Sequence, residues 1–249
     1  MIRTLKVLSV LLTYPTAELQ AAAPEMRAAL AEEGLLPAAH RRAVEGLIDD
    51  LAARDLYDAQ ERYVLLFDRT RSLSLHLFEH VHGESRDRGQ AMVDLLRLYE
   101  EAGFQADARE LPDFLPMFLE YAATRPLPEA MELIGQPGHV LAALGERLRR
   151  RGSAYAAVFA ALTALGRARL DAGALAALRA EPDPEPDDFA ALDAAWEEEE
   201  VRFAPAAGEA CGTERMAARL RQARRPAPGT QAGAVRPATV IRTAAPPRA

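Results

Sequence analysis

The apolar residues of this chain are mainly Leu and Ala, and this preference constrains the fold more than any short motif does. Both residues are strong helix formers. Val and Ile are few, and no stretch alternates apolar with polar residues over the length of a strand. We therefore expect an all-α protein. Of its 249 residues 49% are hydrophobic, enough for a sizeable core.

Capping residues, glycines and prolines divide the chain into helical segments. Thr16 can cap a helix that Gly34 ends, and Asp55 can cap another. Gly103 and Phe104 are typical of a Schellman cap. We expect helices before Pro15, over 16–33, 37–54, from 55 onward, over 66–82, from 84 or 85 to 103, from 111–113, from 128, over 138–150 and 153–170, and a last short one over 187–200.

The C-terminal segment differs from the rest in composition and charge. From about Pro205 onward Pro, Ala, Gly, Arg and Thr dominate and the helical period fades. We predict a single-domain helical bundle over 1–205 and a disordered, Arg/Pro/Ala-rich tail over 206–249. The tail has eight Arg and two Glu, a net charge of +6, so the other 205 residues carry −13. An acidic body favours a basic partner and argues against nucleic acid as its ligand.

The number of cysteines and the hydropathy of the N-terminal segment indicate where in the cell the protein is located. Cys211 is the one cysteine, so a disulfide framework is excluded, and a cytoplasmic location fits. The N-terminal run Val7 to Leu12 follows basic residues, but it is short and interrupted by Ser9. We interpret it as a buried first helix rather than a signal peptide, and we expect no insertion into the membrane.

Residues 76–80 read HLFEH and match H-x-x-E-H, the zinc-peptidase pattern in which two histidines hold the metal and the glutamate serves as base. His76 and His80 at i and i+4 on a helix can share one metal ion. Zinc needs a third protein ligand. Glu84 and Asp87 are local candidates, but a helix break is expected before them. Semi-buried histidines that bond to backbone or acids are therefore favoured over a metal site.

The longer run around this motif is far more specific. Residues 63–104 read YVLLFDRTRSLSLHLFEHVHGESRDRGQAMVDLLRLYEEAGF, followed by ELPDFLPMFLEYAA at 110–123 and LDAAWEEEEVRF at 192–203. Together they resemble the nitrate reductase molybdenum cofactor assembly chaperones, also called the delta subunit family of respiratory nitrate reductase. In the last motif Glu200 stands where the family often has proline. The resemblance covers roughly residues 1–205.

The resemblance implies the all-helical fold of the dedicated molybdoenzyme chaperones and no catalysis. It implies that the chain binds the apo catalytic alpha subunit of nitrate reductase, in part through that subunit's basic N-terminal segment. It further implies help with insertion of bis-molybdopterin guanine dinucleotide into the client, without permanent binding of any cofactor or metal, and absence from the finished enzyme. Cofactor-biosynthesis proteins are further candidate partners.

A client-binding hypothesis follows from this resemblance and a helical wheel. Leu77, Phe78, Met117 and Tyr121 would form an apolar groove for a client helix, with acids at its rim that pair with basic client residues. The rim acids would be Glu84, Asp87, Asp113 and Glu120. His80, His82, Arg86 and Arg88 would order the loop, and protonation of the histidines would tune client release.

Two alternatives stay open at this stage. One is a zinc-dependent hydrolase that uses His76, Glu79 and His80. The other is a chaperone of the same superfamily that serves a different molybdoenzyme.

Overall fold

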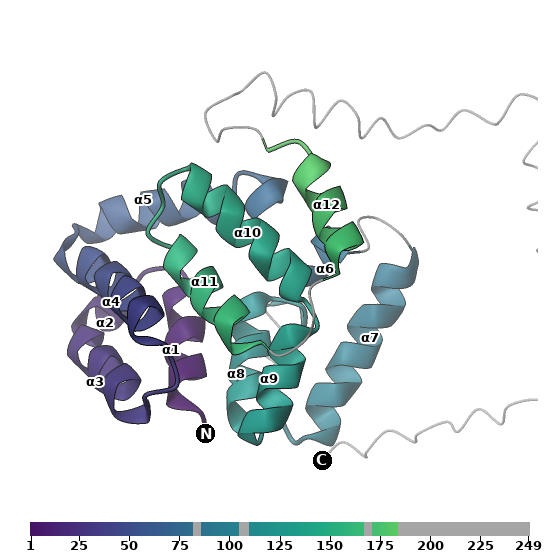
Figure 1. Ribbon diagram of the computed structural model, residues 1–249, viewed down its shortest axis with the longest axis horizontal. Coiled ribbons are helices and arrows are strands. Elements are labelled where there is room, and N and C mark those ends of the chain that lie inside the picture. Colours follow the sequence, from purple (N-terminus) through teal and green to yellow (C-terminus); the bar gives the residue numbers. More distant parts are fainter. Residues whose placement is uncertain (82–85, 105–109, 167–170, 184–249) are drawn as a thin grey trace, which may run out of the picture. The chain divides into compact units, whose positions relative to one another are not determined.

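The computed structural model describes residues 1–81, 86–104, 110–166 and 171–183, and Figure 1 shows their arrangement. In this part of the chain the regular elements are all helices, as predicted. They are α1 (Arg3–Leu11), α2 (Ala17–Ala21), α3 (Ala23–Glu33), α4 (Ala38–Ala53), α5 (Leu56–Phe67), the 3₁₀ turn η1 (Arg71–Leu73), α6 (Leu77–Val81), α7 (Arg86–Glu101), α8 (Leu115–Thr124), α9 (Leu127–Gly135), α10 (Gly138–Arg150), α11 (Ala156–Leu165) and α12 (Ala172–Ala180).

Helix α1 is central to the core, which confirms the buried first helix. Leu5, Leu8 and Leu11 are buried on it. It packs against α3 and α8, and the Ser9 hydroxyl donates to the Pro116 carbonyl of α8 at 2.8 Å. A polar residue inside an apolar run is tolerated here because its hydroxyl is hydrogen-bonded.

The helix expected over 16–33 is two helices. Thr16 caps the first as predicted, accepting the Leu19 amide at 3.2 Å, and Gly34 ends the second in the left-handed conformation at φ 63°. Between them the chain turns at Ala22, and Pro24 lies in the first turn of α3. Proline has no amide hydrogen for a helical bond and its ring crowds the preceding turn, so a continuous helix is interrupted there.

The prediction of one helix over 66–82 is wrong. Helix α5, capped by Asp55 as predicted, ends at Phe67, and α6 begins only at Leu77. The chain between them is bound to the start of α8. The Leu115 amide donates to the Leu75 carbonyl at 2.8 Å, and the Leu77 amide donates to the Asp113 backbone carbonyl at 3.1 Å. These long-range backbone bonds override the local helical pattern.

The later helices follow the predicted punctuation closely. Gly103 at φ 72° ends α7, and the Phe104 amide bonds to the Tyr99 carbonyl at 2.9 Å, which confirms the Schellman cap. Helix α10 has the predicted bounds. The helix expected over 153–170 is shorter, because α11 ends at Leu165, and α12 was not predicted.

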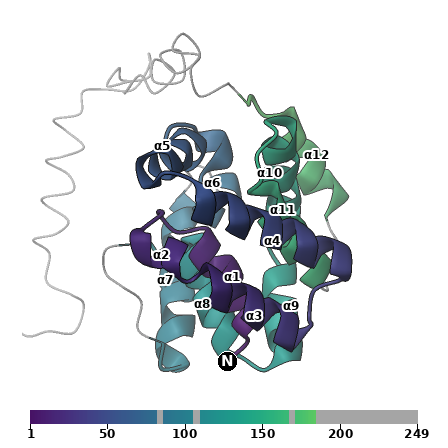
Figure 2. The same cartoon turned by 90° about the vertical axis from the view of Figure 1, so that its left-hand side faces the viewer.

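Helices α10 and α11 lie side by side, as Figures 1 and 2 show. Helix α7 meets α8 through Tyr99 and Tyr121, whose ring centroids lie 4.8 Å apart. Gly145 allows α10 to approach α11 closely, because a Cβ there would lie 3.1 Å from Phe159 Cβ of α11. No helix of the described ranges is long and apolar enough to cross a membrane. The predicted helix at 187–200, the domain boundary at 205 and the tail all lie outside the described residues.

Candidate functional site

The HLFEH stretch is organised by an acid from another part of the chain. Asp113 is fully buried just before α8. One of its carboxylate oxygens lies 3.2 Å from His76 Nδ1, and the other accepts the Phe78 amide at 3.0 Å. The hydrogen bond to Asp113 raises the pKa of His76, and Glu79 and Glu110 act in the same direction.

His80 has a different role from His76. Its Nε2 lies 2.8 Å from the Ser74 carbonyl and therefore donates a hydrogen bond to it. Burial lowers the pKa of His80, with Arg147 as a further cause, so the ring is neutral at neutral pH. Among the described residues no group of three His, Cys, Asp or Glu side chains could hold a metal ion. Both histidines of the motif thus make structural hydrogen bonds.

An open hollow of about 940 Å³ lies against the segment between α5 and α6. Tyr63 and Phe67 of α5 line it, with ring centroids 5.0 Å apart, and Tyr14 meets Tyr63 edge to face at 5.7 Å. Tyr63 and Phe67 are buried, whereas Tyr14 is 48% exposed. The Tyr63 hydroxyl donates to the Leu12 carbonyl at 2.9 Å, and burial raises the pKa of Tyr63. The hollow therefore has a fixed aromatic floor and one exposed aromatic ring.

Charged side chains of both signs surround this floor. Asp68, Glu79 and Glu110 are the acids, and Arg69 and Arg71 are the bases. Glu79 lies 3.3 Å from Arg88 of α7. The hollow can therefore offer an apolar surface and ionic contacts to the same ligand.

Thr70 adds an unsatisfied polar group to the wall of the hollow. It is only 3% exposed, and its Oγ1 has no hydrogen-bond partner among the described residues. A buried hydroxyl without a partner is costly, since it has lost water and gained nothing.

Four of the predicted client-binding residues lie in the core rather than on a groove, and this corrects the helical wheel. Leu77, Met117 and Tyr121 are buried among other apolar side chains. Asp113 cannot be a rim acid in this structure, because it is 0% exposed and its carboxylate already serves His76 and Phe78. For Leu77 the wheel failed because it assumed one continuous helix over 66–82, whereas Met117 and Tyr121 lie on α8, which is buried in the core.

The other predicted residues are distributed over several places. Phe78 is half-buried and packs against the core, and Asp87 is exposed. Glu120 pairs with Lys6 of α1, and Arg88 pairs with Glu79. His80 orders the segment before α6 through Ser74. His82, Glu84 and the side chain of Arg86 lie outside the described residues.

Sequence reasoning missed most of the hollow. Tyr63 and Thr70 lie in the quoted 63–104 run, but Tyr14 and Glu110 come from distant segments. The one available signal was the specificity of that run upstream of the histidines. Its DRTRS segment, residues 68–72, follows α5 and supplies four residues of the lining.

These observations define an all-helical protein with an open hollow of aromatic and charged side chains, in which both histidines of the apparent zinc motif are structural. The model of the nitrate reductase delta subunit family matches residues 16–161, and the chain belongs to that family.

The chain is also similar to named relatives over most of its length. It is 45% identical over 218 residues to the nitrate reductase molybdenum cofactor assembly chaperone NarJ of Escherichia coli K12, covering 88% of this chain and 91% of the relative. It is 41% identical over 210 residues to the probable chaperone NarW of the same strain, covering 83% and 86%. It is 31% identical over 164 residues to the probable chaperone NarJ of Bacillus subtilis strain 168, covering 65% and 86%.

Proposed function

We propose that this protein is a dedicated chaperone of respiratory nitrate reductase. It binds the apo catalytic alpha subunit in the cytoplasm, keeps it competent for insertion of bis-molybdopterin guanine dinucleotide, and leaves before the enzyme is complete. The observation that carries the proposal is the 45% identity to a named assembly chaperone over 88% of the chain. In this role the protein is not an enzyme and holds no cofactor permanently.

The hollow is our proposed site for the basic N-terminal segment of the client. Its aromatic floor suits apolar client side chains, and Asp68 and Glu110 at the rim suit a lysine or arginine. The exposed ring of Tyr14 offers a face for a cation. Because Arg69 and Arg71 share the rim, the hollow would accept a segment with few basic residues more readily than a polybasic one.

Calorimetric titration of the full chain with a synthetic peptide of the client's N-terminal segment tests the proposal. We expect binding that weakens as salt is added, because ion pairs at an exposed rim are screened. The double variant Asp68→Asn/Glu110→Gln should lose both affinity and salt dependence. Glu132→Gln on α9, an exposed acid that does not line the hollow, is the matched control and should bind normally.

The possible results distinguish an error in the position of the client site from an error in the proposed function. Normal binding by the double variant would move the client site away from the hollow. The earlier candidates at Glu84, Asp87 and Glu120 would then be tested by Ala substitution in the same assay. If the full chain binds neither this peptide nor the co-expressed apo alpha subunit, the chaperone assignment fails. Binding to another molybdoenzyme's leader alone would identify a different client.

A further inference from the structure

We infer that residues 178–183, at the end of α12, act as a strap that fixes the wall of the hollow, so that release of the strap weakens binding there. The wall is the segment 70–76, which contains η1. The affinity part of this inference rests on the proposed function of the hollow. The mechanical part, that the strap holds the wall, stands on the contacts alone.

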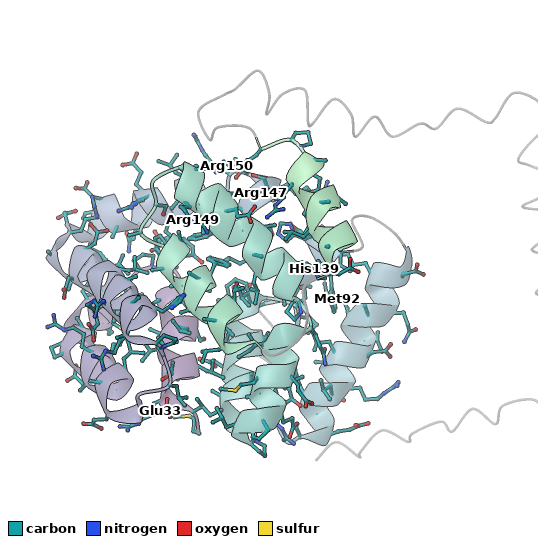
Figure 3. All side chains as sticks on the ribbon, in the orientation of Figure 1. Glu33, Met92, His139, Arg147, Arg149 and Arg150 are labelled. Carbon is teal, nitrogen blue, oxygen red and sulfur yellow. The ribbon has the colours of Figure 1, made fainter. Side chains whose placement is uncertain are left out.

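The first contact is a buried cation that joins the wall to the strap. Arg147 of α10 is 2% exposed, and Figure 3 shows it on the side of α10 that faces α12. Its Nη1 donates to the Ser72 carbonyl at 2.7 Å. Its Nη2 donates to the Leu178 carbonyl at 2.5 Å and lies 3.2 Å from Glu181. A desolvated guanidinium needs all of these acceptors, so wall and strap are bound through one side chain.

A second, independent set of contacts joins the same two segments. The Ser72 hydroxyl donates to Asp183 Oδ1 at 2.8 Å. The same carboxylate accepts from Arg151 at 2.6 Å and from Arg150 at 3.0 Å. The Asp183 side chain is 17% exposed, and that of Arg151 is 6% exposed. The bond between Arg151 and Asp183 is sheltered from solvent and so exceeds ordinary surface pairs in strength, whereas Arg150 is exposed.

The opposite side of this wall lines the hollow. Thr70, Arg71 and Ser74, which flank or begin η1, are lining residues, whereas Ser72 between them faces the strap. Within the turn the Leu73 amide donates to the Thr70 carbonyl at 3.2 Å and the Ser74 amide to the Arg71 carbonyl at 3.1 Å, and at its end His80 donates to the Ser74 carbonyl at 2.8 Å. A short irregular turn of this kind depends on external contacts for its position.

Coupling between strap and hollow follows from this arrangement. If 178–183 leaves, Arg147 loses Leu178 and Glu181 and the Ser72 hydroxyl loses Asp183, so the start of the turn at Thr70 and Arg71 can shift, while Ser74 stays bonded to His80. An occupant that requires the fixed wall must then supply the free energy of reordering it. By reciprocity, an occupant in the hollow stabilises the docked strap.

The test uses Asp183→Asn in the full chain with two readouts. In the free protein we expect faster amide hydrogen exchange of Leu73 and Ser74. In peptide titration we expect affinity to fall about five-fold or more, mainly through faster dissociation. The matched control is Asp49→Asn, since Asp49 of α4 pairs with Arg27 of α3 at 2.5 Å, an ion pair that includes no residue of the turn or the strap. It should leave both readouts unchanged, and Asp183→Glu should restore them in part.

The outcomes decide the inference separately from the proposed function. Faster exchange with weaker binding supports the strap. Unchanged affinity in Asp183→Asn, while the wild type binds, overturns the coupling. If the wild type binds no peptide, the proposed function of the hollow fails, and unchanged exchange at Leu73 and Ser74 would still overturn the strap. Ser72→Ala, which removes one hydroxyl, repeats both measurements should Asp183→Asn fold poorly.

Discussion

Asp113 and His76 lie 37 positions apart in the chain, yet the buried carboxylate of one holds the imidazole of the other at 3.2 Å. The second oxygen of Asp113 accepts the Phe78 amide in the first turn of α6. The start of α6 and the end of the preceding wall are thus fixed by one side chain from the loop before α8. The HLFEH stretch depends on this long-range contact for its conformation.

Asp113→Ala should therefore destabilise the protein by about 2–3 kcal/mol, because it leaves the Phe78 amide and His76 without a buried acceptor. Urea denaturation followed by circular dichroism gives the free energy of unfolding. Asp113→Asn should cost less, since its amide oxygen can still accept one of the two bonds. Asp87→Ala on exposed α7 is the control and should stay within about 0.5 kcal/mol of wild type. Equal stability of Asp113→Ala and wild type would contradict the role of this acid.

The raised pKa of His76 predicts a pH dependence with a definite sign. Because the folded-state pKa exceeds the unfolded value, the stabilisation from protonated His76 is fully present below the unfolded pKa. It is lost as pH rises through the folded pKa. The difference in free energy of unfolding between wild type and His76→Gln should thus be larger at pH 6 than at pH 8.5. A difference that is constant or grows with pH would show that Asp113 does not stabilise the charged ring.

His80 should titrate in the opposite direction. Its pKa is lowered by burial, so on acidification the unfolded chain takes up a proton before the folded one, and stability is lost as pH falls below the unfolded value. NMR titration of the imidazole signals, assigned with His76→Gln and His80→Gln variants, would place His76 above and His80 below the ordinary histidine value. A reversed order would mean that the hydrogen-bond partners of the two rings are wrong.

Two helix glycines of different surroundings give a prediction about packing. Gly46 of α4 is exposed, and an added Cβ would meet nothing within 4 Å, so Gly46→Ala should stabilise the protein by about 0.5–1 kcal/mol. At Gly145 the added Cβ would lie 3.1 Å from Phe159 Cβ, which moves only with α11. Gly145→Ala should therefore destabilise by about 1–2 kcal/mol. Thermal unfolding of the two variants measures both effects, and stabilisation by both would show that α10 and α11 are not closely packed at this point.

Local signals in the sequence were enough for most helix ends. The cap at Asp55, the Schellman cap at Gly103 and the proline-led start of α9 each depend on one or two residues, whereas α8 begins at Leu115, after the predicted 111–113. The wall 70–76 could not be predicted in this way. Its conformation is set by Asp113, Arg147 and the backbone of Leu115, which are distant in sequence. A helical wheel assumes that the helix exists. It placed Leu77 on an exposed groove, whereas the structure buries Leu77 in the core.

The same geometry predicts the outcome of a metal analysis. The zinc hypothesis needs His76 and His80 on one helical face, but His76 precedes α6 and forms an isolated antiparallel bridge with Phe114. His80 Nε2 donates to the Ser74 carbonyl, so only Nδ1 of this ring could bind a metal, and among the described residues no group of three possible ligands comes together. Protein purified without chelator should therefore contain substoichiometric zinc, and His76→Ala should not change the amount. Stoichiometric zinc that is lost on His76→Ala would contradict this prediction and favour the hydrolase hypothesis.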